Sequence, residues 1–419
     1  MCRRIALFAL VLFSLSSTAQ RSDSLIASTL RGHGVRFSHD NSVVLLMSGQ
    51  QKFDDMFCAI SQARSSIHLE YFNFRNDSIA ARLFDLLRTK RSEGVEVRAI
   101  FDGFGNDSNN RPLLKRHLKS LRSAGIEIVE YDPIRFPWVN HIFGRDHRKI
   151  VVIDGNVAYT GGMNVADYYI NGTEQVGEWR DMHCRIEGDA VNELQRIFLR
   201  IWNRTTGDNV SGAQYYRGGT LTDFSSLRPD TTATSGSKMI GIINREPHVT
   251  PRIMRQFYLA AINTAQDSIK IINPYFTLTP KLTRALTRAI KRGVKVEIMQ
   301  SARSDIPLTP DCGYYQAHKL MRRGAMVWLY EPGFHHSKIM TVDGSYCTIG
   351  STNLDARSLK CDFEENAVIL DSATTSQLDA MFRSDCTHSI RLTDESWNAF
   401  RTPWQKCRGW LAHLLSFVL

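Results

Sequence analysis

Residues 147–164 read HRKIVVIDGNVAYTGGMN, and residues 336–353 read HSKIMTVDGSYCTIGSTN. In both stretches a lysine lies two residues after a histidine, and an aspartate lies seven residues after the same histidine. Both end in Gly-Gly or Gly-Ser, one further residue and an asparagine. One match to a short pattern is a weak signal, but two matches with the same extended spacing are not expected by chance. The pair predicts that one structural unit is written twice in the chain.

Other segments repeat in the same order around these two stretches. Residues 59–74 resemble 261–276, residues 94–102 resemble 293–301, and residues 123–133 resemble 322–332. In each block a helical pattern leads into a short apolar run, which is typical of a buried strand. The alternation predicts an α/β fold with helices on both faces of a sheet, in two homologous domains that pack as a pseudo-dimer.

Composition predicts the domain boundaries and the class of binding partner. The 419 residues are 43% hydrophobic and 22% charged, as in a globular protein, and the formal charge is +10. This charge predicts attraction to a polyanion, either nucleic acid or an anionic membrane surface. We expect a first domain over residues 40–204, a linker over 205–238, where Gly, Ser, Thr and Asp predominate, and a second domain over 239–419.

The N-terminus resembles an export signal. Two arginines precede an apolar run and a small-residue site, so residues 1–19 are predicted to be a signal peptide. An uncleaved N-terminal membrane anchor is the alternative, although the run is short for a spanning helix. We therefore expect the protein to be exported, and to be periplasmic or peripherally membrane-associated. Residues 404–419 mix basic residues and Trp with an apolar face, as interfacial helices do, and core packing is the alternative.

The motif residues converge on one small volume. Side chains two apart on a strand share a face, so each histidine lies beside the lysine that follows it, and the glycine turn returns the asparagine to the same face. Lysine and asparagine offset the charge of a phosphate, while one imidazole can attack phosphorus and another can protonate a leaving alkoxide. The predicted site comprises His147, Lys149, Asp154, His336, Lys338 and Asp343 as the catalytic set, with Asn164 and Asn353 binding phosphate.

Each imidazole also needs a carboxylate that fixes its tautomer. Asp181 and Glu365 follow the two motifs on apolar strands and are the expected orienting groups. Asp154 and Asp343 end the motif strands, so we expect them to support the lysine or the following turn. The histidine spacing matches no familiar zinc pattern and lysine repels cations, so no metal and no other cofactor is predicted.

These residues resemble the phospholipase D superfamily, and within it the bacterial cardiolipin synthases with two motifs. The segments LEYFNFRND (69–77), GGMNVADYY (161–169), WRDMH (179–183) and STNLDARSL (351–359) carry the resemblance. It implies two mixed β-sheets flanked by helices, no metal, and a phosphohistidine intermediate. It also implies that His147 is the nucleophile and His336 the general acid and then base. Glu70 matches an acidic position common in cardiolipin synthases.

The resemblance implies that two phosphatidylglycerols are joined with release of glycerol, so the expected partners are this anionic phospholipid and a membrane surface. Hydrolysis of phospholipids by the same site is the alternative, and a nuclease or a decayed binding module is less favoured. Nucleic acid is therefore an unlikely partner, and the sequence leaves the oligomeric state open. A lipid site also needs an apolar lining, for which we expect the following aromatic residues: Tyr71, Phe72, Phe136, Trp138 and Tyr275.

Overall fold

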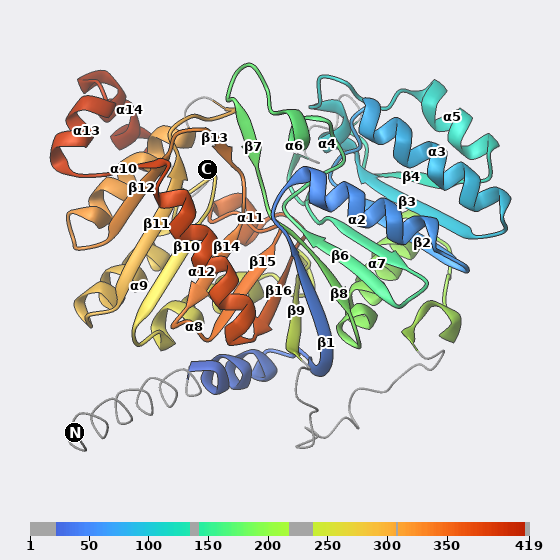
Figure 1. The fold of residues 1–419 in the computed structure, drawn as a ribbon, viewed down its shortest axis with the longest axis horizontal. Helices are drawn as coiled ribbons and strands as arrows, with labels where there is room; N and C mark the ends of the chain where they lie inside the picture. The colour runs from blue at the N-terminus through green and yellow to red at the C-terminus, as the bar shows by residue number, and fades with distance from the viewer. Residues whose placement is uncertain (1–21, 135–141, 218–237, 307–308, 415–419) are drawn as a thin grey trace, which may run out of the picture.

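The computed structural model describes residues 22–134, 142–217, 238–306 and 309–414 (Figure 1). The predicted signal peptide and most of the predicted linker lie outside these residues. The described part of the linker forms the end of a helix and a short turn that packs on the first half through Tyr215. None of the described helices is long and apolar enough to cross a bilayer.

The two halves contain equivalent elements. In the first half the strands are β1 (Phe37–Leu46), β2 (Ser66–Tyr71), β3 (Glu96–Asp102), β4 (Glu127–Tyr131), β5 (Ile150–Ile153), β6 (Val157–Gly161) and β8 (His183–Glu187). Its helices are α2 (Gly49–Ser61), α3 (Ser78–Ser92), α4 (Gly103–Asp107), α5 (Lys115–Ser123), α6 (Tyr168–Asn171) and α7 (Ala190–Thr206). In the second half the strands are β9 (Lys238–Arg245), β10 (Ser268–Ile272), β11 (Lys295–Ser301), β12 (Met326–Tyr330), β14 (Ile339–Val342), β15 (Tyr346–Gly350), β16 (Glu364–Leu370) and β17 (Ser389–Arg391). Its helices are α8 (Ile253–Thr264), α9 (Pro280–Lys291), α10 (Thr309–Met321), α11 (Ala356–Lys360), α12 (Ser372–Cys386), α13 (Asp394–Phe400) and α14 (Pro403–Leu414).

The strand order confirms the predicted duplication. From the centre outward the first half runs β1, β8, β6, β5, β2, β3, β4, and the second runs β9, β16, β15, β14, β10, β11, β12, with β17 at the edge. In each half the last three strands of this common order are parallel and the others are antiparallel, so both sheets are mixed. The resemblance implied two sheets, but β1 and β9 pair antiparallel and join them into one.

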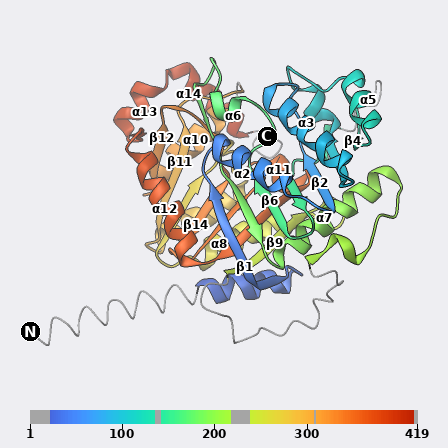
Figure 2. The same ribbon diagram turned by 45° about the vertical axis from the view of Figure 1, so that its right-hand side comes forward.

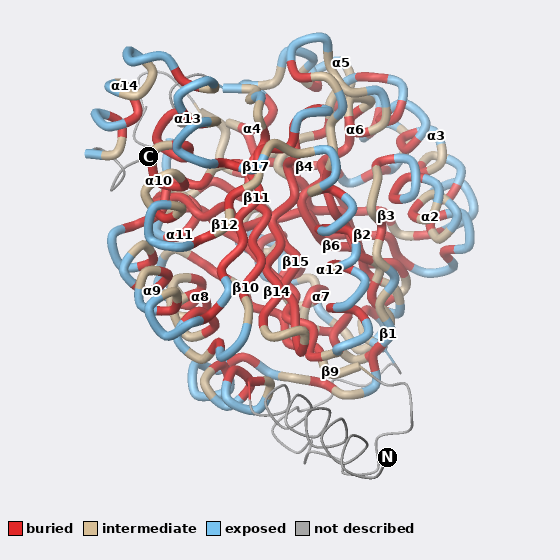
Figure 3. Tube along the Cα trace, turned by 60° about the vertical axis from the view of Figure 1, so that its left-hand side comes forward, coloured by how far each residue is buried: buried red, intermediate tan, exposed pale blue. Residues whose placement is uncertain are grey.

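Helices cover both faces of this sheet, as expected for an α/β fold. In α9 the buried residues Leu282, Ala285, Leu286 and Ala289 recur with helical spacing, which produces one apolar face. The helices α7 and α12 share a core that contains side chains of both halves, including Ile150 and Ile369. Figure 3 shows the buried strands between more exposed helices. The halves are therefore packed as one body.

A two-stranded ribbon also links the halves, at the upper edge of Figure 1. Here β7 (Glu178–Arg180) pairs in parallel with β13 (Gly333–His335). A Cβ atom on Gly333 would lie 2.0 Å from the carbonyl oxygen of Glu178, so only glycine permits this approach. Because the ribbon immediately precedes Asp181 and His336, it fixes where these two residues meet.

Candidate active site

His147 lies between the halves. Its backbone N–H donates to the carbonyl of Phe363 at 3.1 Å, and its Nδ1 lies 3.1 and 3.2 Å from the two carboxylate oxygens of Glu364. Glu364 is fully buried at the start of β16. A first-half histidine is thus oriented by a second-half carboxylate.

His336 makes the reciprocal contacts. Its backbone N–H donates to the carbonyl of Arg180 at 2.6 Å, and its Nδ1 lies 2.7 Å from Asp181 Oδ2. An ionised carboxylate at Nδ1 favours the tautomer that leaves Nε2 free for chemistry. Each half therefore supplies the carboxylate that orients the histidine of the other half.

The prediction that Glu365 orients a histidine is wrong, because its neighbour Glu364 contacts His147. Glu365 points to the opposite face of β16 and accepts a hydrogen bond from Thr160. Burial raises the pKa of Glu365 to about 8, so this carboxyl is largely protonated at neutral pH.

The strand register contains the signal that identifies Glu364. The glycines that end β6 and β15 pair with His183 and Asn366, so these two residues are equivalent. Two residues before them lie Asp181 and Glu364, whereas Glu365 is one position too late. The sequence shows this equivalence only when both strands are aligned on their pairing partners.

The two motif lysines are buried beside the histidines. Lys338 Nζ lies 3.0 Å from His336 Nδ1 and 3.1 Å from Nε2, and it donates to the His336 carbonyl at 2.6 Å. Lys149 donates to the carbonyl of His147. Burial lowers the pKa of Lys338 to about 8, against the opposing charge of Asp181. Both ammonium groups lie where the charge of a phosphate would compensate their burial.

Asn164 and Asn353 occupy equivalent buried positions after β6 and β15. The side-chain Oδ1 atoms of both lack a hydrogen-bond partner among the described residues. The predicted phosphate-binding role remains a prediction. Sequence reasoning missed the buried Lys52. Its Nζ donates to the carbonyls of Met163 at 3.3 Å and Asn164 at 3.0 Å, and these bonds fix the asparagine loop of the first half.

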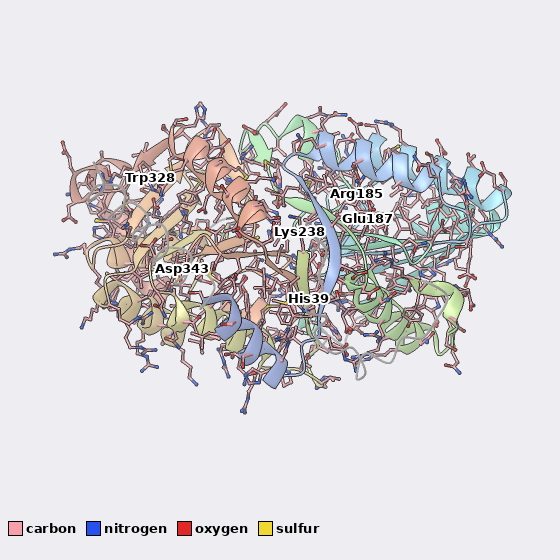
Figure 4. All side chains as sticks on the ribbon, turned by 60° about the horizontal axis from the view of Figure 1, so that its bottom comes forward. His39, Arg185, Glu187, Lys238, Trp328 and Asp343 are labelled. Atoms are coloured by element: carbon pink, nitrogen blue, oxygen red, sulfur yellow. The ribbon has the colours of Figure 1, made fainter. Side chains whose placement is uncertain are left out.

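Asp154 and Asp343 lie away from the histidines, which corrects their place in the catalytic set. Asp154 accepts backbone N–H bonds of 2.8–2.9 Å from residues 64–66, and Asp343 accepts bonds of 2.7–3.2 Å from residues 266–268. Both have a positive φ of about 50°. In Figure 4, Asp343 is labelled among the elements of the second half, at the left of the view. These aspartates brace the loops before β2 and β10, and they orient neither the lysines nor a substrate.

Glu70 lies behind His147 in a buried ionic network. Arg148 Nε lies 2.6 Å from Glu70 and 3.1 Å from Asp146. Burial raises the pKa of Glu70, and Arg148 opposes this shift. Because Glu70 is fully buried on β2, the geometry assigns it to the support of the segment that carries His147.

Aromatic side chains surround both histidines. The Phe72 ring lies 5.1 Å from that of His147, and the rings of Trp179, Tyr275 and Phe334 lie 5.4–6.0 Å from that of His336. The lining prediction thus holds for Phe72 and Tyr275. It is wrong for Tyr71, which is in the core against Met56 and Lys52. Phe136 and Trp138 lie outside the described residues.

The electrostatic environment of the protein alone favours neutral imidazoles. Burial lowers the pKa of His336 to about 4 with help from Lys338, and Asp181 opposes the shift. Burial, Lys149 and Lys338 also lower the pKa of His147. A bound anion beside these cations would favour protonation again. In the described part of the chain, no group of three or more His, Cys, Asp or Glu residues is arranged to hold a metal ion.

Comparison with known proteins agrees with this geometry. Residues 56–202 and 258–386 each match the family model described as cardiolipin synthase, PLD-like domain. Cardiolipin synthase 1 of Bacillus cereus is 33% identical over 365 residues, which cover 85% of this chain and 68% of the relative. Cardiolipin synthase 2 of Staphylococcus epidermidis is 34% identical over 397 residues, which cover 94% and 78%.

The fold is also shared with a solved structure. The phosphatidylserine synthase of Haemophilus influenzae Rd KW20 superposes with a TM-score of 0.69 over 96% of this chain and 100% of its own, at 15% identity. The duplicated sheet with its two-histidine centre defines a protein of the phospholipase D superfamily. Within it, the chain belongs to the cardiolipin synthase family of PLD-like proteins.

We expect a narrow bell-shaped dependence of activity on pH. Burial raises the pKa of Glu364 to about 7, against the charge of Lys149, so the orienting carboxylate of His147 is lost as the pH falls through 7. Lys338, with its pKa near 8, loses its charge as the pH rises through 8. Initial rates at limiting substrate should therefore be highest between these values. A flat profile from pH 5 to 9 would contradict this assignment.

Proposed function

We propose that the chain joins two phosphatidylglycerol molecules into cardiolipin and releases glycerol. One observation carries the proposal: two histidines, each oriented by a carboxylate of the other half, share one buried site with two lysines. Family membership makes the chain a phosphatidyltransferase of the phospholipase D superfamily, and the B. cereus and S. epidermidis relatives support the particular reaction.

In the first step, His147 Nε2 attacks phosphorus and forms a P–N bond while the P–O bond to the glycerol headgroup breaks. Glu364 accepts the hydrogen bond from Nδ1 and stabilises the positive charge that develops on the ring. His336, protonated once the anionic substrate is bound, transfers its proton to the leaving alkoxide. The products of this step are a phosphatidyl-histidine and glycerol.

In the second step, the neutral His336 takes the proton from a hydroxyl of the second phosphatidylglycerol. The oxygen of this hydroxyl attacks phosphorus, the P–N bond breaks, and His147 regains its lone pair. Lys149 and Lys338 offset the charge of the pentacoordinate transition state, and the side chains of Asn164 and Asn353 are suited to donate hydrogen bonds to its oxygens. With water in place of the second lipid, the same step would yield phosphatidic acid.

Lipid products test the proposal directly. The purified protein should consume phosphatidylglycerol in mixed micelles and form glycerol and a four-chain lipid, in equal amounts and unaffected by EDTA. Phosphatidic acid as the only lipid product would support hydrolysis instead. Loss of activity on chelation, restored by zinc or magnesium, would contradict the metal-free mechanism. Cleavage of DNA or RNA without lipid turnover would support a nuclease.

We further propose that the protein is exported and that it lies on a membrane surface. The helix α14 supports the contact with a membrane. Its small residues Gly409 and Ala412 are buried against α10, while its large apolar residues point outward. The exposed fractions are 67% for Trp404, 47% for Trp410, 46% for Leu411 and 54% for Leu414. A soluble helix normally has the opposite arrangement, whereas an interfacial helix presents such a face to lipid.

The position of α14 fits this role. It lies at the same edge of the molecule as β7 and β13, which directly precede Asp181 and His336, and the helix over residues 22–32 lies at the opposite edge (Figures 1 and 2). The basic Lys406 and Arg408 belong to the same helix, and the chain carries a formal charge of +10. Export itself is tested by the N-terminal sequence of the mature protein, which should begin near residue 20.

The double variant Trp410→Glu/Leu411→Glu should bind anionic vesicles at least about tenfold more weakly, because burying one large apolar side chain contributes roughly 1.5–3 kcal/mol. The measurement is co-sedimentation with phosphatidylglycerol-containing vesicles, in a His147→Ala background so that the lipid is not consumed. Leu25→Glu, on the opposite edge and 39% exposed, is the matched control. Equal binding by both variants would exclude α14 as the membrane contact.

A further inference from the structure

A second cavity shares a wall with the catalytic site. It encloses about 590 Å³, within the range of about 300–1,000 Å³ that is typical of ligand pockets. We call it the headgroup pocket. Its charged lining combines Arg75 and Arg111 with the carboxylates of Asp77, Asp167, Glu174 and Asp305, and Asn110, Tyr168 and Trp179 also line it. Asp305 belongs to the second half and the other residues to the first, so the pocket also lies between the halves.

Two of these residues connect the pocket to the chemistry. The Trp179 ring lies 5.5 Å from the ring of His336, and it also packs against Tyr168 at 4.4 Å. Asp305 accepts a 2.7 Å hydrogen bond from Tyr275, whose ring lies 6.0 Å from His336. Trp179 and Tyr275 thus mark the border between the pocket and His336.

Arg75 is the cation that could contact an anion within this mixed lining. Its side chain is 17% exposed, and its guanidinium lies 5.4 Å above the Tyr168 ring. Asp77 and Asp167 already accept hydrogen bonds from the start of α3. Asp77 Oδ2 lies 3.9 Å from Arg75 Nε and also accepts the backbone N–H of Asp167 at 2.8 Å. The guanidinium therefore retains donors in the fork geometry that suits a phosphodiester.

The remaining lining suits a polyol. Side-chain amides and carboxylates, such as those of Asn110 and Asp305, can accept hydrogen bonds from hydroxyl groups, and Arg75 can bind the charge next to them. Transfer between two phosphatidylglycerols requires such a site, because the acceptor carries its own phosphodiester near its reacting hydroxyl. The two catalytic lysines neutralise the phosphate of the donor, so the acceptor needs a separate cation.

We infer that the headgroup pocket binds the accepting phospholipid, with Arg75 on its phosphodiester and its glycerol hydroxyl directed past Trp179 towards His336. This inference rests on the proposed function. Occupation of the pocket would also exclude water from the second step, so the pocket determines how the intermediate divides between transfer and hydrolysis. Arg75 is a specificity residue for the acceptor and takes no part in forming the intermediate.

The test compares two rates for the full chain in phosphatidylglycerol micelles. The pre-steady-state burst of glycerol release reports the first step, because in the steady state each glycerol released is matched by one product of the second step. The ratio of cardiolipin to phosphatidic acid reports the second step. Arg75→Ala should lower this ratio by about tenfold or more, the loss expected for one charge-assisted hydrogen bond, and leave the glycerol burst nearly unchanged. Arg75→Lys should restore part of the ratio. Arg82→Ala removes an exposed arginine of α3 outside the pocket and is the control.

The outcomes distinguish failure of the pocket assignment from failure of the proposed function. If Arg75→Ala matches the control, or if the glycerol burst falls in parallel with cardiolipin formation, the pocket assignment is wrong and the proposed function stands. If the wild-type chain forms phosphatidic acid and no cardiolipin, the proposed function fails, and the assignment of an acceptor lipid fails with it.

Discussion

Replacing either His147 or His336 by alanine should reduce turnover by at least about 10⁴-fold, because each removes a group that forms or breaks a bond. The two histidines act on one phosphate, so their effects should not add. The double variant should be little slower than the slower single variant. The measurement is release of glycerol from phosphatidylglycerol over a wide range of enzyme concentration.

Quenching with alkaline detergent during turnover distinguishes the two roles, because the P–N bond of a phosphohistidine is labile in acid and stable in base. Phosphate should be trapped on His147 alone. The His336→Ala variant should either form this adduct slowly or lose it slowly. His388→Ala replaces an exposed histidine on the loop before β17 and should leave the rate unchanged. Near-normal rates in both single variants, with the fold intact by thermal unfolding, would contradict the two-histidine mechanism.

The second large effect concerns the carboxylate that orients His147. Glu364→Gln should lower kcat by about 10²- to 10⁴-fold with little change in KM, because the amide cannot stabilise the positive ring of the intermediate. The acidic limb of the pH profile near 7 should disappear as well, since Glu364 is the group assigned to it. A purely structural role would change neither the pH profile nor kcat selectively.

Glu365→Gln is the matched control, one residue away on the same strand. Burial raises the pKa of Glu365 to about 8, so glutamine replaces a carboxyl that is mostly neutral at pH 7. It can still accept the hydrogen bond from Thr160. Activity close to wild type is expected for this variant. If Glu365→Gln is the more damaging of the two changes, the orienting carboxylate has been assigned to the wrong residue.

The sequence determined the architecture because the information that specifies it is local. Helical and strand periodicities, the glycine turns and the two His-x-Lys stretches each extend over fewer than about twenty residues. Their repetition in one order predicted two homologous α/β domains, and the strand order confirms this. His147 and Lys149, or His336 and Lys338, must lie together because only one residue separates them.

Only the tertiary structure decided which groups complete the site. The contact between His147 and Glu364 spans 217 positions, and that between His336 and Asp181 spans 155. Side chains alternate across a strand, so a shift of one residue moves a carboxylate to the opposite face, as with Glu365. Local patterns leave that register open. It is set when β6 pairs with β8 and β15 with β16. The pairing of β1 with β9 and of β7 with β13 then joins the halves, so that each carboxylate lies against the histidine of the other half.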